Sequence, residues 1–456
     1  MEMRLYGFLL FIITSGFLMG SCGKNDPEPG TISIVSITSD GSRLTDGAEN
    51  LSVRPVIEMV FSSALDPAGL RSALSVSAAT GTVSVETAFS NQASRVVLEP
   101  ELAYNTSYTL TISDAPIGIH GGSLEDELSI SFTTREDGTI HSMTPCTSAS
   151  GSCLHTIDLS AAENAAFSFY SSFPIYEDNA EWTGIKGAIV VVHGASRNPD
   201  DYFNHVMGTL TSEGLEESIV LIAPFYKNEV EAAAGDLFWK GADWREGANS
   251  ISEVRTSSYT VLDTIISRLA DTDHFPVLEN IIVTGQSSGG CFTHLYAAAN
   301  SVEGAFQSIS FDYVVSESQY FYYPDGRRIN ESNNQMYMPT GCAGYDIWPI
   351  GYKVLPPVLA PVTKEVFNDR FVNRSIIYLL GNGDEVDGSL NTRDCHATLL
   401  GSTRYRRGKH MFRYMELVYP GEHNHRVEEV NGVTHDGSAM YGSDVFSILI
   451  KELLGI

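Results

Sequence analysis

The sequence predicts an all-β sandwich followed by an α/β domain whose sheet is mostly parallel and doubly wound. Residues 32–134 contain short alternating strands such as "PVIEMVF" and "SYTLTI", separated by turn residues, which is typical of a sandwich of about 100 residues. Residues 160–456 contain unalternated apolar strands such as "GAIVVVHG" between helical stretches. That pattern indicates a parallel sheet with helices on both faces.

The N-terminal residues 1–21 are expected to be a signal peptide. Arg4 precedes the apolar run "LYGFLLFIITSGFLMG", which is too short to span a membrane comfortably. The sequence "LMGSC" resembles a bacterial lipoprotein box, in which Cys22 would carry the lipid and residues 22–31 would form a flexible tether. An ordinary secretory signal cut elsewhere is the alternative. We expect an exported protein at the outer membrane or cell surface.

The charge balance excludes polyanionic partners. The chain has 456 residues, with 28 basic and 56 acidic side chains and a formal net charge of -28. This charge opposes binding to nucleic acid or anionic lipid, so we expect membrane contact only through the lipid on Cys22. We also expect a monomer.

The remaining cysteines predict two disulfides, because an exported protein folds in an oxidising compartment. Cys146 and Cys153 are close enough in sequence to close a small loop. Cys342 and Cys395 form the second expected pair. Cys291 then remains as a buried thiol.

Residues 32–134 resemble the bacterial Ig-like domains of exported proteins, through the segments "VIEMVFSSALD", "LEPELAYNTSYTLTIS" and "ISFTT". The resemblance implies a spacer or adhesion module, with glycan or protein binding as the alternative. No cluster of histidines, cysteines or paired carboxylates in this region indicates catalysis. The polar, Pro- and Ser-rich residues 135–159 are expected to be a linker.

The stretch "NIIVTGQSSGGCF" predicts a nucleophile on a tight turn between a buried strand and an alanine-rich helix. The residues two before and two after such a nucleophile crowd neighbouring backbone and must be small. Ser287 satisfies this requirement with Gly285 and Gly289. Ser288 would place Gln286 where glycine is needed, so Ser287 is the predicted nucleophile.

A serine nucleophile needs a histidine base and a carboxylate that orients the histidine. In the hydrolase arrangement these follow the serine in the order acid, then histidine, at the ends of later strands. Asp384 lies on the tight loop after "RSIIYLLG" and is the predicted acid, with Asp387 and Glu385 as rivals. His435, on the loop after the last strand, is the predicted base.

Two backbone amides are expected to bind the oxyanion. One is the N–H of Ser288, at the start of the alanine-rich helix that follows Ser287. The other is the N–H of Ala195, on the loop after the strand that ends in His193, and His193 itself is expected to be structural. The close pair His423 and His425 lacks a third ligand with recognisable spacing, so a solvated turn is expected there. We expect neither a metal nor an organic cofactor.

The segments "HGASRNPDDYF", "GQSSGG", "LLGNGDEVD" and "VNGVTHDG", in this order, resemble secreted α/β-hydrolases of the polyhydroxyalkanoate depolymerase and feruloyl esterase type. The resemblance covers about residues 160–456. It implies the α/β-hydrolase fold and a serine esterase with a Ser-His-Asp triad. Depolymerases usually carry Cys and Gln where this chain has Ala195 and Arg197. A serine peptidase and a non-catalytic surface binder are the alternatives.

Residues 317–372 lack clear periodicity and are expected to form a lid or substrate cap. Trp239, Trp244, Tyr320 and Trp348 are expected to line a cleft that stacks on a sugar or aromatic ring. The surface anchor and the Ig-like spacer favour an acyl ester on a large external substrate, such as an acylated polysaccharide.

Overall fold

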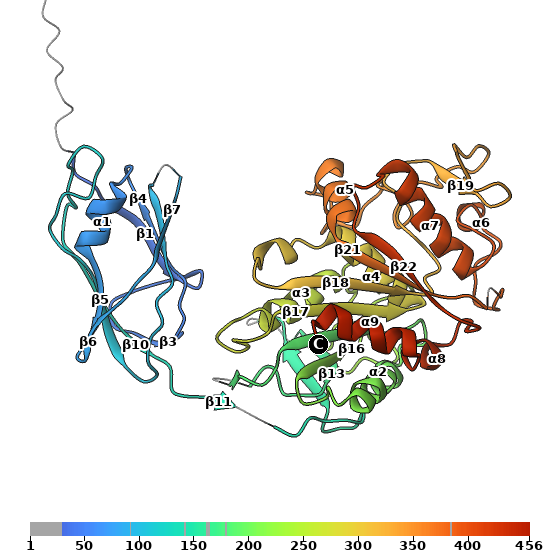
Figure 1. Cartoon of the computed structure of the whole chain (residues 1–456), viewed down its shortest axis with the longest axis horizontal. Coiled ribbons are helices and arrows are strands. Elements are labelled where there is room, and N and C mark those ends of the chain that lie inside the picture. The colour runs from blue at the N-terminus through green and yellow to red at the C-terminus, as the bar shows by residue number, and fades with distance from the viewer. Residues whose placement is uncertain (1–29, 92, 141–142, 161–164, 178–179, 384) are drawn as a thin grey trace, which may run out of the picture. The chain divides into compact units, whose positions relative to one another are not determined.

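The computed structural model describes residues 30–456, except for 92, 141–142, 161–164, 178–179 and 384. The chain divides into two compact units, Met1–Glu136 and Asp137–Ile456 (Figure 1). The predicted signal segment and the lipid site Cys22 lie outside the described residues. Within the described part of the chain, no helix has the length and apolar character needed to cross a membrane.

The first unit is a β-sandwich of two five-stranded sheets, with strand orders β2-β1-β4-β8-β7 and β3-β10-β9-β5-β6. Every segment in which a strand was expected between residues 32 and 134 contains one. The strands are β1 (Ile34–Ser39), β2 (Ser42–Arg43), β3 (Ala48–Leu51), β4 (Ile57–Phe61), β5 (Leu74–Ala78), β6 (Gly81–Val83), β7 (Thr87–Ser90), β8 (Arg95–Leu98), β9 (Ser107–Ile112) and β10 (Leu128–Thr134). Alternate residues of β4 are buried between the sheets, as the period of two predicts. The short helix α1 (Pro67–Ala73) begins at Asp66, whose carboxylate accepts the N–H groups of Ala68 and Gly69.

The second unit is built on an eight-stranded sheet with the order β12-β13-β16-β15-β17-β18-β21-β22. Its strands are β12 (Leu154–Asp158), β13 (Ala166–Ser171), β15 (Gly187–Val192), β16 (Ile219–Pro224), β17 (Asn280–Gln286), β18 (Ser310–Ser316), β21 (Ser375–Gly381) and β22 (His425–Val430). β13 pairs antiparallel with both β12 and β16, and the other pairs in this sheet are parallel. A separate short pair joins β11 (Thr139–Ile140) to β14 (Glu181–Trp182).

Helices cover both faces of this sheet (Figure 1). Successive residues of β15 show the two layers, because Val190 packs in one apolar cluster while Ile189 and Val191 pack in the other. The first cluster includes α3 (Ser258–Leu269), α4 (Ser288–Ala299), α5 (Lys364–Asn373) and α7 (Arg404–Val418), and the second includes α2 (Pro199–Glu213), α8 (Gly437–Tyr441) and α9 (Asp444–Leu454). The short elements η1 (Asp243–Glu246), η2 (Glu303–Ala305) and α6 (Cys395–Thr398) lie in connections. The predicted doubly wound α/β architecture is confirmed.

The stretch expected to be a linker, residues 135–159, belongs mostly to the second unit. Cys146 and Cys153 form a disulfide, and Cys153 is buried in the core of this unit. The Ala149 N–H donates to Asn204 Oδ1 at 2.8 Å, which attaches the disulfide loop to α2. β12 then forms an edge strand. An edge strand of mixed polarity lacks the continuous apolar run of the central strands, so its sequence resembles a loop.

The connection between β18 and β21 is an ordered insertion. It contains the hairpin of β19 (Arg328–Asn330) and β20 (Gln335–Tyr337), and then α5. The buried Arg328 donates to the carbonyls of Asp325, Arg327 and Tyr345 at 3.0, 2.8 and 3.1 Å. A second disulfide, Cys342–Cys395, ties the insertion to α6, and Cys291 is a free buried thiol. Both disulfides join the pairs that the sequence predicted.

Candidate active site

Ser287 occupies a strained turn between β17 and α4. Its backbone has φ 62° and ψ -115°, a conformation that non-glycine residues rarely adopt. Its N–H donates to the Ser316 carbonyl of the neighbouring strand at 3.0 Å. Ser288 is the first residue of α4, with ordinary helical geometry. Of the two serines, Ser287 therefore has the backbone of a nucleophile elbow.

Glycines around Ser287 allow this turn to form. A β-carbon at Gly289 would overlap the carbonyl oxygen of Val192, at the end of β15. A β-carbon at Gly285 would overlap the backbone of Gly289, and one at Gly290 would overlap the Ser316 carbonyl. The start of α4 thus approaches the ends of β15 and β18 only because these positions lack side chains. This contact gives the predicted Gly-x-Ser-x-Gly spacing a steric cause.

The loop that carries His435 packs against the elbow. The Tyr202 hydroxyl donates to Gln286 Oε1 at 2.6 Å. Burial raises the pKa of Tyr202 to about 12, so this donor stays protonated. A β-carbon at Gly437, two residues beyond His435, would lie 3.6 Å from Gln286 Oε1. The loop after β22 therefore reaches the residue that precedes Ser287.

His435 faces a carboxylate on one side only. Its Nδ1 lies 3.6 Å from Asp387 Oδ2. Its Nε2 is buried and has no hydrogen-bond partner among the described residues. In a triad, Nδ1 faces the acid and Nε2 accepts the proton of the nucleophile. The two ring nitrogens of His435 have the environments that these roles require.

The predicted acid, Asp384, lies outside the described residues, and the structure places its rival Asp387 beside His435. The side chain of Asp387 also accepts the N–H of Ser389 at 2.7 Å, within the sequence "DGS". Such a turn fixes a carboxylate on an otherwise irregular loop. The turn motif was the available sequence signal for Asp387, whereas Asp384 is favoured only by its proximity to the strand end.

Arg404, at the start of α7, completes this group. Its Nε lies 2.8 Å from the same Asp387 Oδ2, and its side chain is 3% exposed. Burial alone would raise the pKa of Asp387, but the hydrogen bonds from Arg404 and Ser389 bring it well below its usual range. Burial and the positive charge of Arg404 lower the pKa of His435 to about 4, although Asp387 and Asp436 oppose this shift. At neutral pH the arrangement holds an ionised acid and a neutral base.

The end of β21 is held from two sides. The Gly381 N–H donates to Glu317 Oε1 at 2.7 Å, and Glu317 is buried with a positive φ of 46°. The Gly383 N–H donates to the Val433 carbonyl at 2.8 Å. The loop of the acid and the loop of His435 are therefore joined directly.

The two predicted oxyanion amides belong to segments that pack against each other. Gly289 approaches the carbonyls of Val192 and His193, so the start of α4 packs on the loop that contains Ala195. Among the described residues, no acceptor takes a hydrogen bond from the amide of Ser288 or of Ala195. Unpaired amide donors at a helix start can stabilise a developing negative charge.

His193, expected to be structural, and His425, expected in a solvated turn, are both packed in the interior. His193 Nε2 accepts the Tyr226 N–H at 3.2 Å, and burial lowers the pKa of His193 to about 3. His425 is also buried, with Tyr378 and Phe371 as partners at 2.9 and 2.7 Å, which differs from the expected solvated turn. Among the described residues, no group of three or more His, Cys, Asp or Glu side chains could hold a metal ion.

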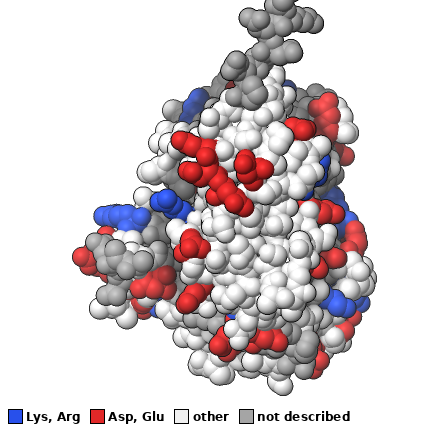
Figure 2. Space-filling view, turned by 90° about the vertical axis from the view of Figure 1, so that its left-hand side faces the viewer, with Lys and Arg blue, Asp and Glu red and all other residues white. Residues whose placement is uncertain are grey.

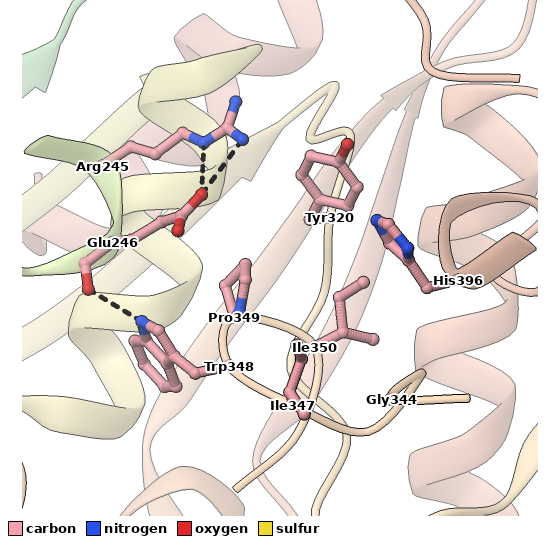
Figure 3. Close-up of a pocket in the computed structure, with 9 residues that line it drawn as sticks. All are labelled: Arg245, Glu246, Tyr320, Gly344, Ile347, Trp348, Pro349, Ile350 and His396. Atoms are coloured by element: carbon pink, nitrogen blue, oxygen red, sulfur yellow. Dashed lines mark hydrogen bonds and ion pairs between the residues drawn. The ribbon is translucent and has the colours of Figure 1, made fainter. Parts of the chain in front are cut away.

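A pocket of about 190 Å³ (Figure 3) is connected to the start of α4 through Arg245, whose Nη1 lies 3.5 Å from Ser288 Oγ. It is lined by Arg245, Glu246, Tyr320, Gly344, Ile347, Trp348, Pro349, Ile350 and His396. Two of the four aromatic residues expected at a substrate cleft, Tyr320 and Trp348, are among them. The other two, Trp239 and Trp244, are 0% and 1% exposed. They are core residues, because Trp244 stacks on Tyr226 with ring centroids 5.3 Å apart and Trp239 donates to the Ala248 carbonyl.

Comparisons with known proteins agree with the two-part architecture. Residues 36–134 match the family of bacterial Ig-like domains. None of the curated proteins matches the sequence.

Several solved structures are similar to part of this chain. A poly(3-hydroxybutyrate) depolymerase from Bordetella parapertussis is 17% identical, with a TM-score of 0.47, covering 66% of this chain and 90% of its own. A poly(aspartic acid) hydrolase from Sphingomonas sp. KT-1 is 15% identical, with a TM-score of 0.47, covering 66% and 98%. Est1E from Butyrivibrio proteoclasticus is 14% identical, with a TM-score of 0.30, covering 66% and 95%.

The fold assignment follows from the geometry described above. The strand order, the elbow after β17 and the loops after β21 and β22 are arranged as in an α/β-hydrolase. Residues 36–134 therefore match a bacterial Ig-like domain, and the second unit has the α/β-hydrolase fold.

Proposed function

We propose that the protein is a serine hydrolase of carboxylic esters, with Ser287 as nucleophile, His435 as base and Asp387 as the acid. Two observations carry this proposal: Ser287 has the strained backbone of a nucleophile elbow, and His435 Nδ1 faces the carboxylate of Asp387. Strain at a non-glycine residue persists where the surrounding structure supports a function. Asp387 replaces the sequence-based choice of Asp384 because of its contact with His435.

In the proposed reaction, Ser287 Oγ attacks the ester carbonyl carbon while His435 Nε2 accepts its proton. The amides of Ser288 and Ala195 donate hydrogen bonds to the oxyanion of the tetrahedral intermediate. The bond to the alcohol breaks, and His435 returns the proton to the departing alcohol. Water then attacks the acyl-enzyme, and His435 takes a proton from it and passes that proton to Ser287 as the carboxylic acid leaves.

An ester is preferred to a peptide because an alkoxide leaves more readily than an amine. A serine peptidase and a non-catalytic surface binder are the competing functions. Fluorophosphonate labelling, followed by a comparison of p-nitrophenyl esters with chromogenic peptides, separates the three. We expect one adduct, on Ser287, and ester cleavage that Ser287→Ala removes. Absence of the adduct in folded protein would refute the hydrolase proposal, and faster peptide cleavage would favour the peptidase.

The choice of Ser287 rather than Ser288 as the nucleophile has its own control. Ser288→Ala retains the backbone N–H that is proposed to bind the oxyanion, so labelling of Ser287 should persist in this variant. If Ser288→Ala abolished labelling and Ser287→Ala did not, the assignment of the nucleophile would be wrong.

We further propose that the protein is exported and anchored through Cys22, with the Ig-like domain as a spacer. The sequence "LMGSC" supports the lipid site. This location favours esters on large external polymers, such as acylated polysaccharides. Metabolic labelling with a palmitate analogue in a bacterial host tests the anchor, since Cys22→Ala should abolish incorporation.

A further inference from the structure

The pocket of Figure 3 is linked to the elbow through Arg245. Arg245 lines the pocket, and its Nη1 lies 3.5 Å from Ser288 Oγ. Ser288 directly follows the nucleophile, so a group in the pocket can belong to the molecule whose ester reaches Ser287. The volume of about 190 Å³ is below the roughly 300–1,000 Å³ of sites for drug-sized ligands. It suits a single ring.

One side of the pocket is formed by an ion pair, so it carries no net charge. Arg245 Nε and Nη2 both donate to Glu246 Oε1 at 3.1 Å (Figure 3). Among the described residues, none donates a hydrogen bond to the second carboxylate oxygen, Glu246 Oε2, while Arg245 Nη1 makes only the long contact to Ser288. The pair therefore offers an acceptor and a donor side by side, with no net charge.

The other walls are apolar and aromatic. Figure 3 shows His396 across the pocket from Arg245, with Pro349 and Ile350 between them. The rings of Tyr320 and His396 are stacked, with centroids 6.3 Å apart. Trp348 Nε1 donates to the Glu246 carbonyl at 2.8 Å, which holds the insertion against η1. Such walls complement the C–H faces of a ring that carries polar groups at its edge.

We propose that this pocket binds one neutral sugar ring, the alcohol portion of the ester; this rests on the proposed esterase function. Hydroxyl groups both donate and accept, so they match the Arg245 and Glu246 pair. An aromatic acyl ring without hydroxyl groups would leave these polar side chains against an apolar edge, which is unfavourable.

A uronate would bring a second carboxylate beside Glu246 in a protein with a net charge of -28. Figure 2, which views the molecule from the left-hand side of Figure 1, shows the same excess of acidic over basic side chains on that face, as the net charge of the chain implies. Charge thus favours a neutral ring over an anionic one.

The test measures binding without turnover. Ser287→Ala protein is titrated with methyl xyloside and methyl glucoside, and binding is followed by ligand-observed NMR. We expect saturable binding that Glu246→Gln weakens by about tenfold, because a neutral amide oxygen accepts a weaker hydrogen bond than a carboxylate. Glu416→Gln is the matched control, since Glu416 forms an exposed ion pair with Arg413 on α7. Tyr320→Leu is a second pocket variant in case Glu246→Gln unfolds, which circular dichroism would show.

Three results would overturn the assignment of the pocket. These are no saturable binding, equal binding in both pocket variants and the control, or tighter binding of methyl glucuronoside or ferulate than of the neutral glycosides. Fluorophosphonate labelling of the wild type is the independent readout. Labelling without sugar binding refutes the pocket assignment alone, whereas sugar binding without labelling refutes the esterase.

Discussion

Arg404 and His435 contact the same oxygen of Asp387. Arg404 Nε lies 2.8 Å from Asp387 Oδ2, and His435 Nδ1 lies 3.6 Å from it. The guanidinium is nearly inaccessible to solvent, so its charge acts on both partners with little screening. The acid of the proposed triad is thus fixed by a residue that begins a later helix.

This contact predicts that Asp387, and not its neighbours, orients the base. Asp387→Asn should lower kcat/KM by about 10³- to 10⁴-fold, because an amide cannot stabilise the imidazolium that forms. Steady-state kinetics with a p-nitrophenyl ester measure the loss, and circular dichroism confirms folding. Glu385→Gln, at an exposed neighbouring position, should change kcat/KM by less than about threefold. A large loss in Asp384→Asn with a small one in Asp387→Asn would contradict the assignment.

The lowered pKa of His435 predicts activity in mild acid. Only the neutral imidazole acts as base, and its pKa is about 4. The activity should therefore persist as pH falls below the usual histidine range, and kcat/KM should decline only near pH 4.

Arg404 provides the internal test of that pH dependence. Arg404→Gln removes a positive charge that lowers the pKa of His435. The acidic limb of the pH profile, the fall of kcat/KM at low pH, should therefore move to higher pH. Arg404→Lys keeps the charge and should keep the limb near its wild-type position, even where kcat falls. An unchanged limb in Arg404→Gln would mean that the Arg404 charge does not act on the base.

The sequence predicted the parts of this site that depend on local pattern. The elbow requires glycines at fixed spacing from Ser287, and His435 directly follows the last strand. Each of the two residues can therefore be found from its own short segment. Arg404 and Arg245 cannot be found in this way, because each lies outside these segments and acquires its role only when the fold brings it to Asp387 or to Ser288. Trp239 and Trp244 show the reverse case. They were predicted to line a cleft, but both are buried. Large aromatic side chains pack in the core by default.

The parallel strands from β15 onward were predicted by the alternation of strands and helices, whereas the edge strand β12 was not. Its residues "LHTID" bury one face only, so their composition resembles that of the preceding loop. The sequence could not select the acid of the triad either, because its three candidates, positions 384, 385 and 387, are neighbours in one stretch without periodicity. Only the fold determines which of them reaches His435.

Close packing at the elbow predicts opposite effects for two glycine substitutions. Gly289→Ala would place a β-carbon against the Val192 carbonyl, so it should reduce both stability and activity strongly. Gly208→Ala is the matched control, since Gly208 lies in α2 and a β-carbon there would meet no atom within 4 Å. It should raise the free energy of unfolding by about 0.5–1 kcal/mol. Thermal or chemical unfolding measures both, and a harmless Gly289→Ala would contradict the elbow geometry.

The disulfide between Cys342 and Cys395 should affect substrate binding as well as stability, because Gly344 and His396 on its two sides both line the pocket. Removing the bridge, which spans 53 residues, should lower the free energy of unfolding by up to about 4 kcal/mol in the chain-entropy treatment.

The matched control is the Cys146–Cys153 bridge, which spans 7 residues and touches no pocket residue among those described. Its removal should lower the free energy of unfolding by about 2 kcal/mol. Replacing each pair by serine and measuring KM separately from kcat distinguishes the two bridges. We expect KM for acetylated sugars to rise only when Cys342 and Cys395 are replaced, and an equal rise in both variants would show that the pocket wall does not depend on this bridge.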